Sequence, residues 1–162
     1  LLEVYKTTPN LYGIQKVVGN GFNSKVAPPP ILGEKGQTGS NDVIVDVDGV
    51  VRRGILFPEP GNSLPSLGLV MAGAYLDKEG IKPEAAPDGS MKLKNTVFSP
   101  FEASDGSYIN ADANGYQIIL NFRGKAKSFT YVSLTDVLKG RIKNDLMRDR
   151  IVLIGAKAAS LN

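Results

Sequence analysis

The chain has 162 residues, of which 42% are hydrophobic and 22% are charged. These proportions are those of a soluble globular domain and are too apolar for a disordered chain. The chain contains no His, no Cys and no Trp. This composition excludes a Ser-His-Asp or Cys-His nucleophile, a zinc site built from Cys or His, and any disulfide.

The formal net charge is +3, and the Lys and Arg residues are spread along the chain. The densest basic stretch, residues 139–150, is interrupted by Asp145 and Asp149. We therefore expect a solvated surface and no nucleic-acid partner. No stretch approaches the roughly 18 apolar residues that a membrane span needs. The chain begins with Leu1 rather than Met, and we expect it to be a piece of a longer protein.

The first part of the chain predicts a helix followed by a strand. Residues 1–8 place Leu1, Val4 and Tyr5 at helical spacing, and Pro9 ends the pattern. Residues 11–18 (LYGIQKVV) predict a strand. Residues 19–40 are rich in Gly and Pro and predict a loop, because their glycine spacing matches no phosphate-binding motif.

Residues 42–57 predict a β-hairpin whose arms meet at Asp48-Gly49, a strong turn signal. The best helix covers residues 64–78, with Asn62 or Ser63 as its N-cap. Residues 81–89 predict a surface connector, and residues 91–98 predict a strand.

The last third of the chain predicts one central strand, a short helix and a second buried strand. Residues 116–122 (YQIILNF) predict a strand in the middle of a sheet. Ser133 and Asp136 form a capping box at the start of a helix over residues 133–139. Residues 150–155 (RIVLIG) predict a buried strand parallel to a neighbour. The expected fold is α/β, or mixed α+β, with a central, mostly parallel sheet flanked by helices and a β-hairpin.

Four charged residues around the predicted hairpin turn are the candidate ligand-binding site: Asp46, Asp48, Arg52 and Arg53. Strand alternation places the two arginines on opposite faces, so that one of them could enter a cleft and bind a carboxylate or phosphate. The alternative is an ion pair between an Arg and an Asp across the hairpin. The sequence favours the ion pair.

Residues 110–115 (NADANG) copy the opening of an EF-hand calcium loop. Position twelve of that loop would be Asn121, where the motif requires a bidentate Glu. We therefore expect no metal site. The residues also offer no nucleophile–base pair, so we expect neither catalytic residues nor a cofactor.

Several stretches, taken together in this order and spacing, resemble the type-two CHASE sensory domains, which are cyclase- and histidine-kinase-associated extracellular sensors. The resemblance is greatest to cyanobacterial members that are linked to nucleotide cyclases. The stretches are 46–53 (DVDGVVRR), 64–69 (LPSLGL), 119–124 (ILNFRG), 129–140 (FTYVSLTDVLKG) and 150–155 (RIVLIG).

The resemblance implies that residues 1–162 are one extracytoplasmic, or periplasmic, sensor domain that is itself not catalytic. The family's first strand and helix would lie before Leu1, and transmembrane helices would flank the domain. The full-length protein would be a membrane receptor, with a cyclase or protein kinase in the cytoplasm. The implied partners are an unidentified small molecule or ion and a second copy of the receptor. A scaffold without a ligand, or an enzyme fragment that works with carboxylates alone, remains the alternative.

Overall fold

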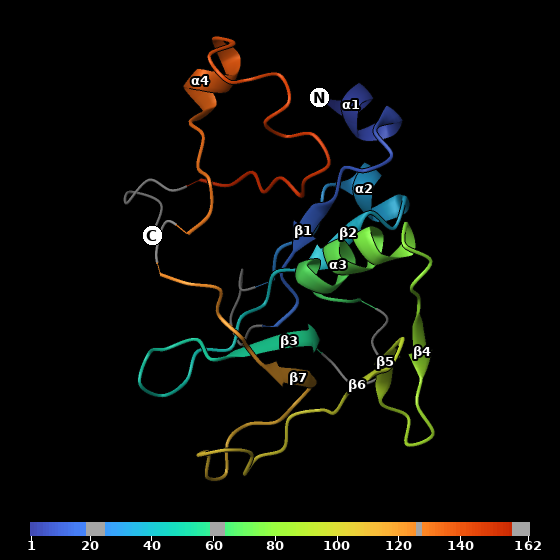
Figure 1. The fold of residues 1–162 in the computed structure, drawn as a ribbon, viewed down its shortest axis with the longest axis vertical. Coiled ribbons are helices and arrows are strands. Elements are labelled where there is room, and N and C mark those ends of the chain that lie inside the picture. The colour runs from blue at the N-terminus through green and yellow to red at the C-terminus, as the bar shows by residue number, and fades with distance from the viewer. Residues whose placement is uncertain (19–24, 59–63, 126–127, 157–162) are drawn as a thin grey trace. The chain divides into compact units, whose positions relative to one another are not determined.

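The computed structural model describes residues 1–18, 25–58, 64–125 and 128–156. The chain divides into two compact units, Leu1–Leu120 and Asn121–Asn162, and each is described by itself. Figure 1 shows the elements in chain order. They are α1 (Leu2–Thr7), β1 (Gly13–Gln15), α2 (Pro30–Glu34), β2 (Thr38–Ser40), β3 (Arg53–Phe57), α3 (Leu67–Asp77), β4 (Pro83–Ala85), β5 (Met91–Leu93), β6 (Thr96–Phe98), β7 (Tyr116–Ile119) and α4 (Leu134–Leu138).

The first unit begins with α1, and β1 then pairs in parallel with β2, so the predicted passage from helix to strand is confirmed with shorter elements. The α2 helix lies between the two strands in sequence and buries Leu32, which is 1% exposed. The Lys35 ammonium group donates to the backbone carbonyls of Tyr5, Lys6 and Thr8 at the end of α1. A cation at this position stabilises the negative end of the helix dipole.

The α3 helix begins where it meets β2. The amide of Ser40 donates to the carbonyl of Pro65 at 2.8 Å, and a Cβ on Gly39 would lie 2.6 Å from the Cα of Leu67. Glycine is therefore required at position 39 for this approach. Ser66 is the N-cap, and its hydroxyl accepts from the amide of Leu69. The helix thus starts later than predicted, and the expected caps Asn62 and Ser63 lie outside the described residues.

The β3 strand pairs antiparallel with β7, from Arg53 opposite Ile119 to Phe57 opposite Tyr116. The predicted hairpin is formed only in part. Its turn is present, since the amide of Gly49 donates to the carbonyl of Asp46 and Gly49 adopts a φ of 79°. Its first arm, however, contacts β3 through a single bridge between Ile44 and Arg53. The longer partner of β3 is β7, which lies some sixty residues further along the chain.

Strands β4, β5 and β6 form an antiparallel meander. The prediction of a plain connector over residues 81–89 is wrong, because residues 83–85 pair with β5. The single strand predicted over residues 91–98 is two short strands. Lys94, with a φ of 55°, makes the turn between them.

The mixed α+β character of the chain is confirmed, but one central, mostly parallel sheet is not found. The described strands form two sheets of two strands and one sheet of three, and β1–β2 is the parallel pair among them. The strand predicted over residues 116–122 is shorter than expected and pairs with β3 in a two-stranded sheet, so it is not central. Short strands and many turns leave little backbone to align into one large sheet.

The second unit contains α4, which is capped as predicted. The Ser133 hydroxyl accepts from the amide of Asp136 at 3.0 Å and donates to its carboxylate at 2.6 Å. The prediction of a buried strand over residues 150–155 is wrong, because these residues form no strand and are exposed, with Ile154 90% exposed. A strand forms only when a neighbouring backbone accepts its hydrogen bonds, and within the described part of this unit none does.

Candidate functional site

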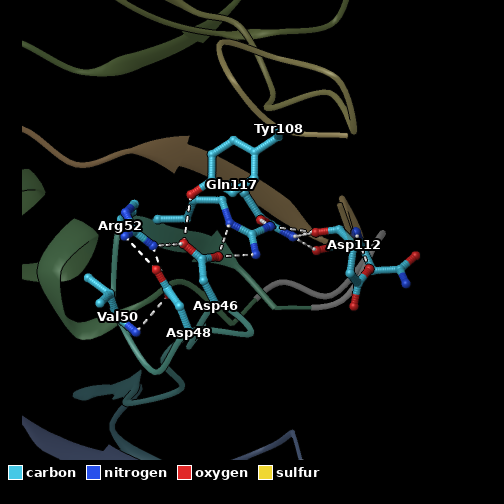
Figure 2. A network of polar contacts seen from close by, with 9 residues as sticks. Asp46, Asp48, Val50, Arg52, Tyr108, Asp112 and Gln117 are labelled. Atoms are coloured by element: carbon cyan, nitrogen blue, oxygen red, sulfur yellow. Dashed lines mark hydrogen bonds and ion pairs between the residues drawn. The ribbon is translucent and has the colours of Figure 1, made fainter. Parts of the chain in front are cut away.

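The four predicted site residues lie together, on the turn after residue 45 and at the start of β3. Figure 2 shows Asp46, Asp48 and Arg52 joined by dashed contacts, with Tyr108 and Gln117 beside them. As alternation predicts, the two arginines differ in environment: Arg53 is 5% exposed, whereas the side chain of Arg52 is 45% exposed. We call the group formed by Asp46, Asp48, Arg52, Arg53, Tyr108, Asp112 and Gln117 the arginine network.

Arg53 is the centre of the arginine network. Its Nε and Nη2 donate to Oδ1 of Asp46 at 3.1 and 2.7 Å. Its Nη1 donates to the carbonyl of Asp112 at 2.7 Å and to Oε1 of Gln117 at 2.9 Å. The guanidinium carbon also lies 5.0 Å from the ring centroids of both Phe101 and Tyr108. A buried charge is tolerated because it is paired, hydrogen-bonded and covered by aromatic faces.

Gln117 ties the preceding loop to β7. Its side-chain amide donates to the carbonyls of Asp112 and Asn114 at 3.0 and 2.7 Å, while its oxygen accepts from Arg53. The residue is 2% exposed. Residues 110–115, which copy the start of a calcium loop, are therefore shaped around Arg53 and Gln117. Among the described residues, no group of three or more acidic side chains is placed to hold a metal ion.

The carboxylate of Asp46 accepts four hydrogen bonds from three residues. Besides Arg53, the Tyr108 hydroxyl donates to Oδ2 at 2.8 Å and Arg52 Nη1 donates to the same atom at 3.1 Å. The pKa of Asp46 is below its ordinary value, chiefly because of the Tyr108 hydrogen bond and then that of Arg53. The pKa of Tyr108 is raised, first by burial and then by its hydrogen bond to Asp46.

Asp48 and Arg52 form the exposed edge of the arginine network. Arg52 donates to both carboxylate oxygens of Asp48 at 2.9 and 2.7 Å, and the amide of Val50 donates to the same carboxylate at 3.2 Å. The Arg52 hydrogen bond is the largest cause that lowers the pKa of Asp48 to about 2. The same pairing raises the pKa of Arg52. A bidentate Arg–carboxylate pair of this kind has a specific geometry, but it contributes little to the stability of the fold when it is exposed.

Within the arginine network the charges of the ion pairs balance, since Asp46 and Asp48 carry two negative charges and Arg52 and Arg53 carry two positive ones. Asp112 contributes its backbone carbonyl to the network. Arg53 is buried and already bonded to three residues, so an incoming anion would meet Arg52 first and would compete there with Asp48. The geometry therefore realises the ion-pair alternative that the sequence favours. It adds that the pairing is partly buried and reaches far beyond the hairpin.

Sequence reasoning missed Tyr108, Phe101 and Gln117 as members of this site. Tyr108 lies 62 residues along the chain from Asp46, to which it donates, and Gln117 lies 64 residues from Arg53, from which it accepts. No local sequence pattern therefore joins them to the hairpin. Gln117 alone carried a signal, because it is a polar residue at the start of an otherwise apolar strand. A polar side chain at such a position is usually hydrogen-bonded inside the protein.

None of the helices in the described part of the chain has the length and apolar character needed to cross a bilayer. The comparisons with curated proteins and with solved structures found no match. The family model of the CHASE2 domain matches residues 1–162, the whole of the chain. CHASE2 domains are extracellular sensor domains of signalling receptors, and their role is sensory rather than catalytic. The resemblance to the type-two CHASE domains is thus confirmed, and the chain belongs to the CHASE2 domain family.

Proposed function

We propose that the chain is the extracytoplasmic sensor of a membrane-bound receptor, which controls a nucleotide cyclase or a protein kinase in the cytoplasm. The observation that carries the proposal is the match of the CHASE2 model over residues 1–162. Within the proposal, the receptor is held in the membrane by helices outside this chain and works as a homodimer.

The structure supports a sensory role through the use it makes of its charged residues. Asp46 and Arg53 bond to each other and to internal partners, which suits a framework that positions a site more than it suits acid–base chemistry. Within the proposal, Asp48 and Arg52 are the members of the arginine network that a charged ligand contacts, because both are exposed. The charged group of the ligand then takes the place of either Asp48 or Arg52 in their ion pair.

The location is tested by labelling one introduced cysteine in a full-length protein whose cysteines outside these 162 residues are replaced by Ser. The 162 residues themselves contain no Cys. Ser107 is exposed, so Ser107→Cys in the full-length protein should react with a membrane-impermeant maleimide on intact spheroplasts. The matched control is Ser90→Cys, since Ser90 is 7% exposed and should react only after denaturation. Labelling of Ser107→Cys only after lysis would contradict the extracytoplasmic location.

The output is tested on membranes that contain the full-length receptor. Cyclic-nucleotide formation and phosphoryl transfer are measured for the parent and for Arg53→Met at equal receptor amounts. Because Arg53 holds the sensor together, its loss should change the output of a domain that the variant does not touch. An output equal to that of the parent, from a receptor whose sensor is shown to be unfolded, would count against a regulatory role.

A further inference from the structure

The first unit contains a cavity of about 750 Å³, distinct from the arginine network. One wall is α3, which contributes Leu69, Gly73 and Leu76. A second wall is the meander, with Met91 and Leu93 of β5, and a third is the end of the β3–β7 pair, with Tyr116. Small-molecule sites in proteins occupy roughly 300–1,000 Å³ and are mostly apolar. A hollow bounded by three walls suits a small molecule better than the flat face of a protein partner.

Two polar groups of the walls, the Tyr116 hydroxyl and the Ser90 amide, are already bonded within the protein. The Tyr116 hydroxyl donates to the carbonyl of Phe98 and accepts from the amide of Met91. The amide of Ser90 donates to the carboxylate of Asp88 at 2.9 Å. A ligand therefore gains nothing in these places by carrying matching polar groups. Its affinity must come from the apolar surface that it removes from water.

The walls also turn no charge into the cavity. Glu84 is the one charged residue among the described residues that line it. In β4 and β5, Glu84 lies opposite Lys92, whereas the flanking pair Ala85 and Met91 lies one position away. Since successive side chains in a strand point to opposite faces, Glu84 and Lys92 share the face that is turned away from Ala85 and Met91. A charged ligand would lose its hydration here without meeting a counter-charge.

We propose that this cavity binds a neutral, apolar or aromatic small molecule. The proposal deepens the sensory role and rests on it for its biological meaning, because it names a second ligand class, neutral and apolar, that the sensor detects. It also gives the sensor a second site, which is distinct from the exposed ion pair of Asp48 and Arg52.

The test uses two fluorescent probes that differ by one charged group. N-phenyl-1-naphthylamine is neutral, and 1-anilinonaphthalene-8-sulfonate is the same framework with a sulfonate. Titrated into the 162-residue chain, the neutral probe should bind saturably at one site, at least tenfold more tightly than the sulfonate. Because the chain has a net charge of +3, non-specific surface binding would favour the anionic probe instead.

The cavity is blocked by Gly73→Leu. A Cβ on Gly73 meets no heavy atom within 4 Å, so the new side chain enters open space without displacing backbone. The matched control is Gly68→Leu on the same helix, which lies outside the cavity and has only the Ser66 hydroxyl at 4.0 Å. Gly73→Leu should weaken the neutral probe at least tenfold, and Gly68→Leu should leave its affinity unchanged. Ala72→Leu, at another lining position, repeats the test if Gly73→Leu does not melt cooperatively.

Non-saturable binding, tighter binding of the sulfonate, or equal affinity in the blocked and control variants would overturn the proposal. Sedimentation velocity at the same concentrations separates a further outcome: if the probe binds only as a dimer dissociates, the cavity is an interface between copies, and the proposal is wrong. Probe binding needs no receptor output. A bound probe together with cytoplasmic labelling of Ser107→Cys would therefore overturn the sensory role and leave the cavity as a binding site.

Discussion

The two ends of the β3–β7 pair have opposite chemistry. At one end Arg53 lies opposite Ile119 and carries the arginine network, where buried polar groups are bonded to one another. At the other end Phe57 lies opposite Tyr116, their rings contact edge to face at 6.2 Å, and an apolar cavity opens beside them. The two ends of the strand pair therefore tolerate change differently. A bonded polar cluster loses stability with any missing partner, whereas open apolar space accepts added atoms.

The largest effect is expected at the centre of the network. Arg53→Met keeps the apolar stem but removes the charge. It leaves the Asp46 carboxylate with Tyr108 and Arg52 as donors, and it leaves the Gln117 oxygen without the donor that Arg53 provides. We expect a loss of about 3–5 kcal/mol in the free energy of unfolding, measured with urea. Arg52→Met is the matched control and should cost much less, because Arg52 is exposed. Equal losses for the two variants would remove the distinction between the buried and exposed arginines.

A smaller loss is expected from Gln117→Leu. Leucine has a similar size, but it leaves Arg53 short of one acceptor and the carbonyls of Asp112 and Asn114 short of their amide donor. We expect about 1–3 kcal/mol of destabilisation in the same urea measurement. Gln15→Leu, at a half-buried glutamine in β1, provides the control and should shift the midpoint far less.

Acid should weaken the network end. The pKa values of Asp46 and Asp48 are lowered in the folded state, that of Asp48 to about 2. A carboxylate with a depressed folded pKa stabilises the protein above its unfolded pKa, and this contribution is lost as pH falls through the folded value. The melting temperature should therefore fall between about pH 4 and pH 2. Tyr108→Phe removes the largest cause of the Asp46 shift, so the folded pKa of Asp46 moves toward its unfolded value and the acid-induced fall should be smaller than in the parent.

The smallest effect is expected at the cavity and has the opposite sign. Gly73→Ala should stabilise the protein by about 0.5–1 kcal/mol, because alanine favours a helix and the added Cβ meets no neighbour. Gly39→Ala makes the same change where the Cβ would collide with the Leu67 backbone, and it should destabilise. Thermal melts of the two variants should shift in opposite directions. A destabilised Gly73→Ala would show that the cavity wall does not accept added atoms.

Local features could be predicted from the sequence because they depend on residues within a few positions of one another. The turn at Gly49 and the cap formed by Ser133 and Asp136 are confirmed, although the 64–78 helix is shorter than predicted. Strand pairing could not be predicted, since β3 had two possible partners and the sequence favoured the nearer one. The apolar run at residues 150–155 predicted burial, but apolarity alone does not supply a partner strand.

Only part of the candidate site could be predicted from the sequence. Asp46 and Arg53 were placed together because a hairpin turn brings neighbours into contact. Tyr108 and Gln117 were missed because β7 and the loop before it come back to β3 from far along the chain. The separation of the arginines into a buried and an exposed residue followed from alternation, but the choice between them needed the structure.

The pairing of β3 with β7 has a consequence for how the chain can vary in length. It brings residues 57 and 116 together, so the intervening segment, with α3 and the meander, leaves the pair and returns to it. The entropy lost in closing such an excursion grows only with the logarithm of its length, by about 0.6 kcal/mol for each doubling. Extra residues inserted at the exposed turn at Lys94 should therefore cost little, and the meander is a segment whose length can change while the strand pair persists.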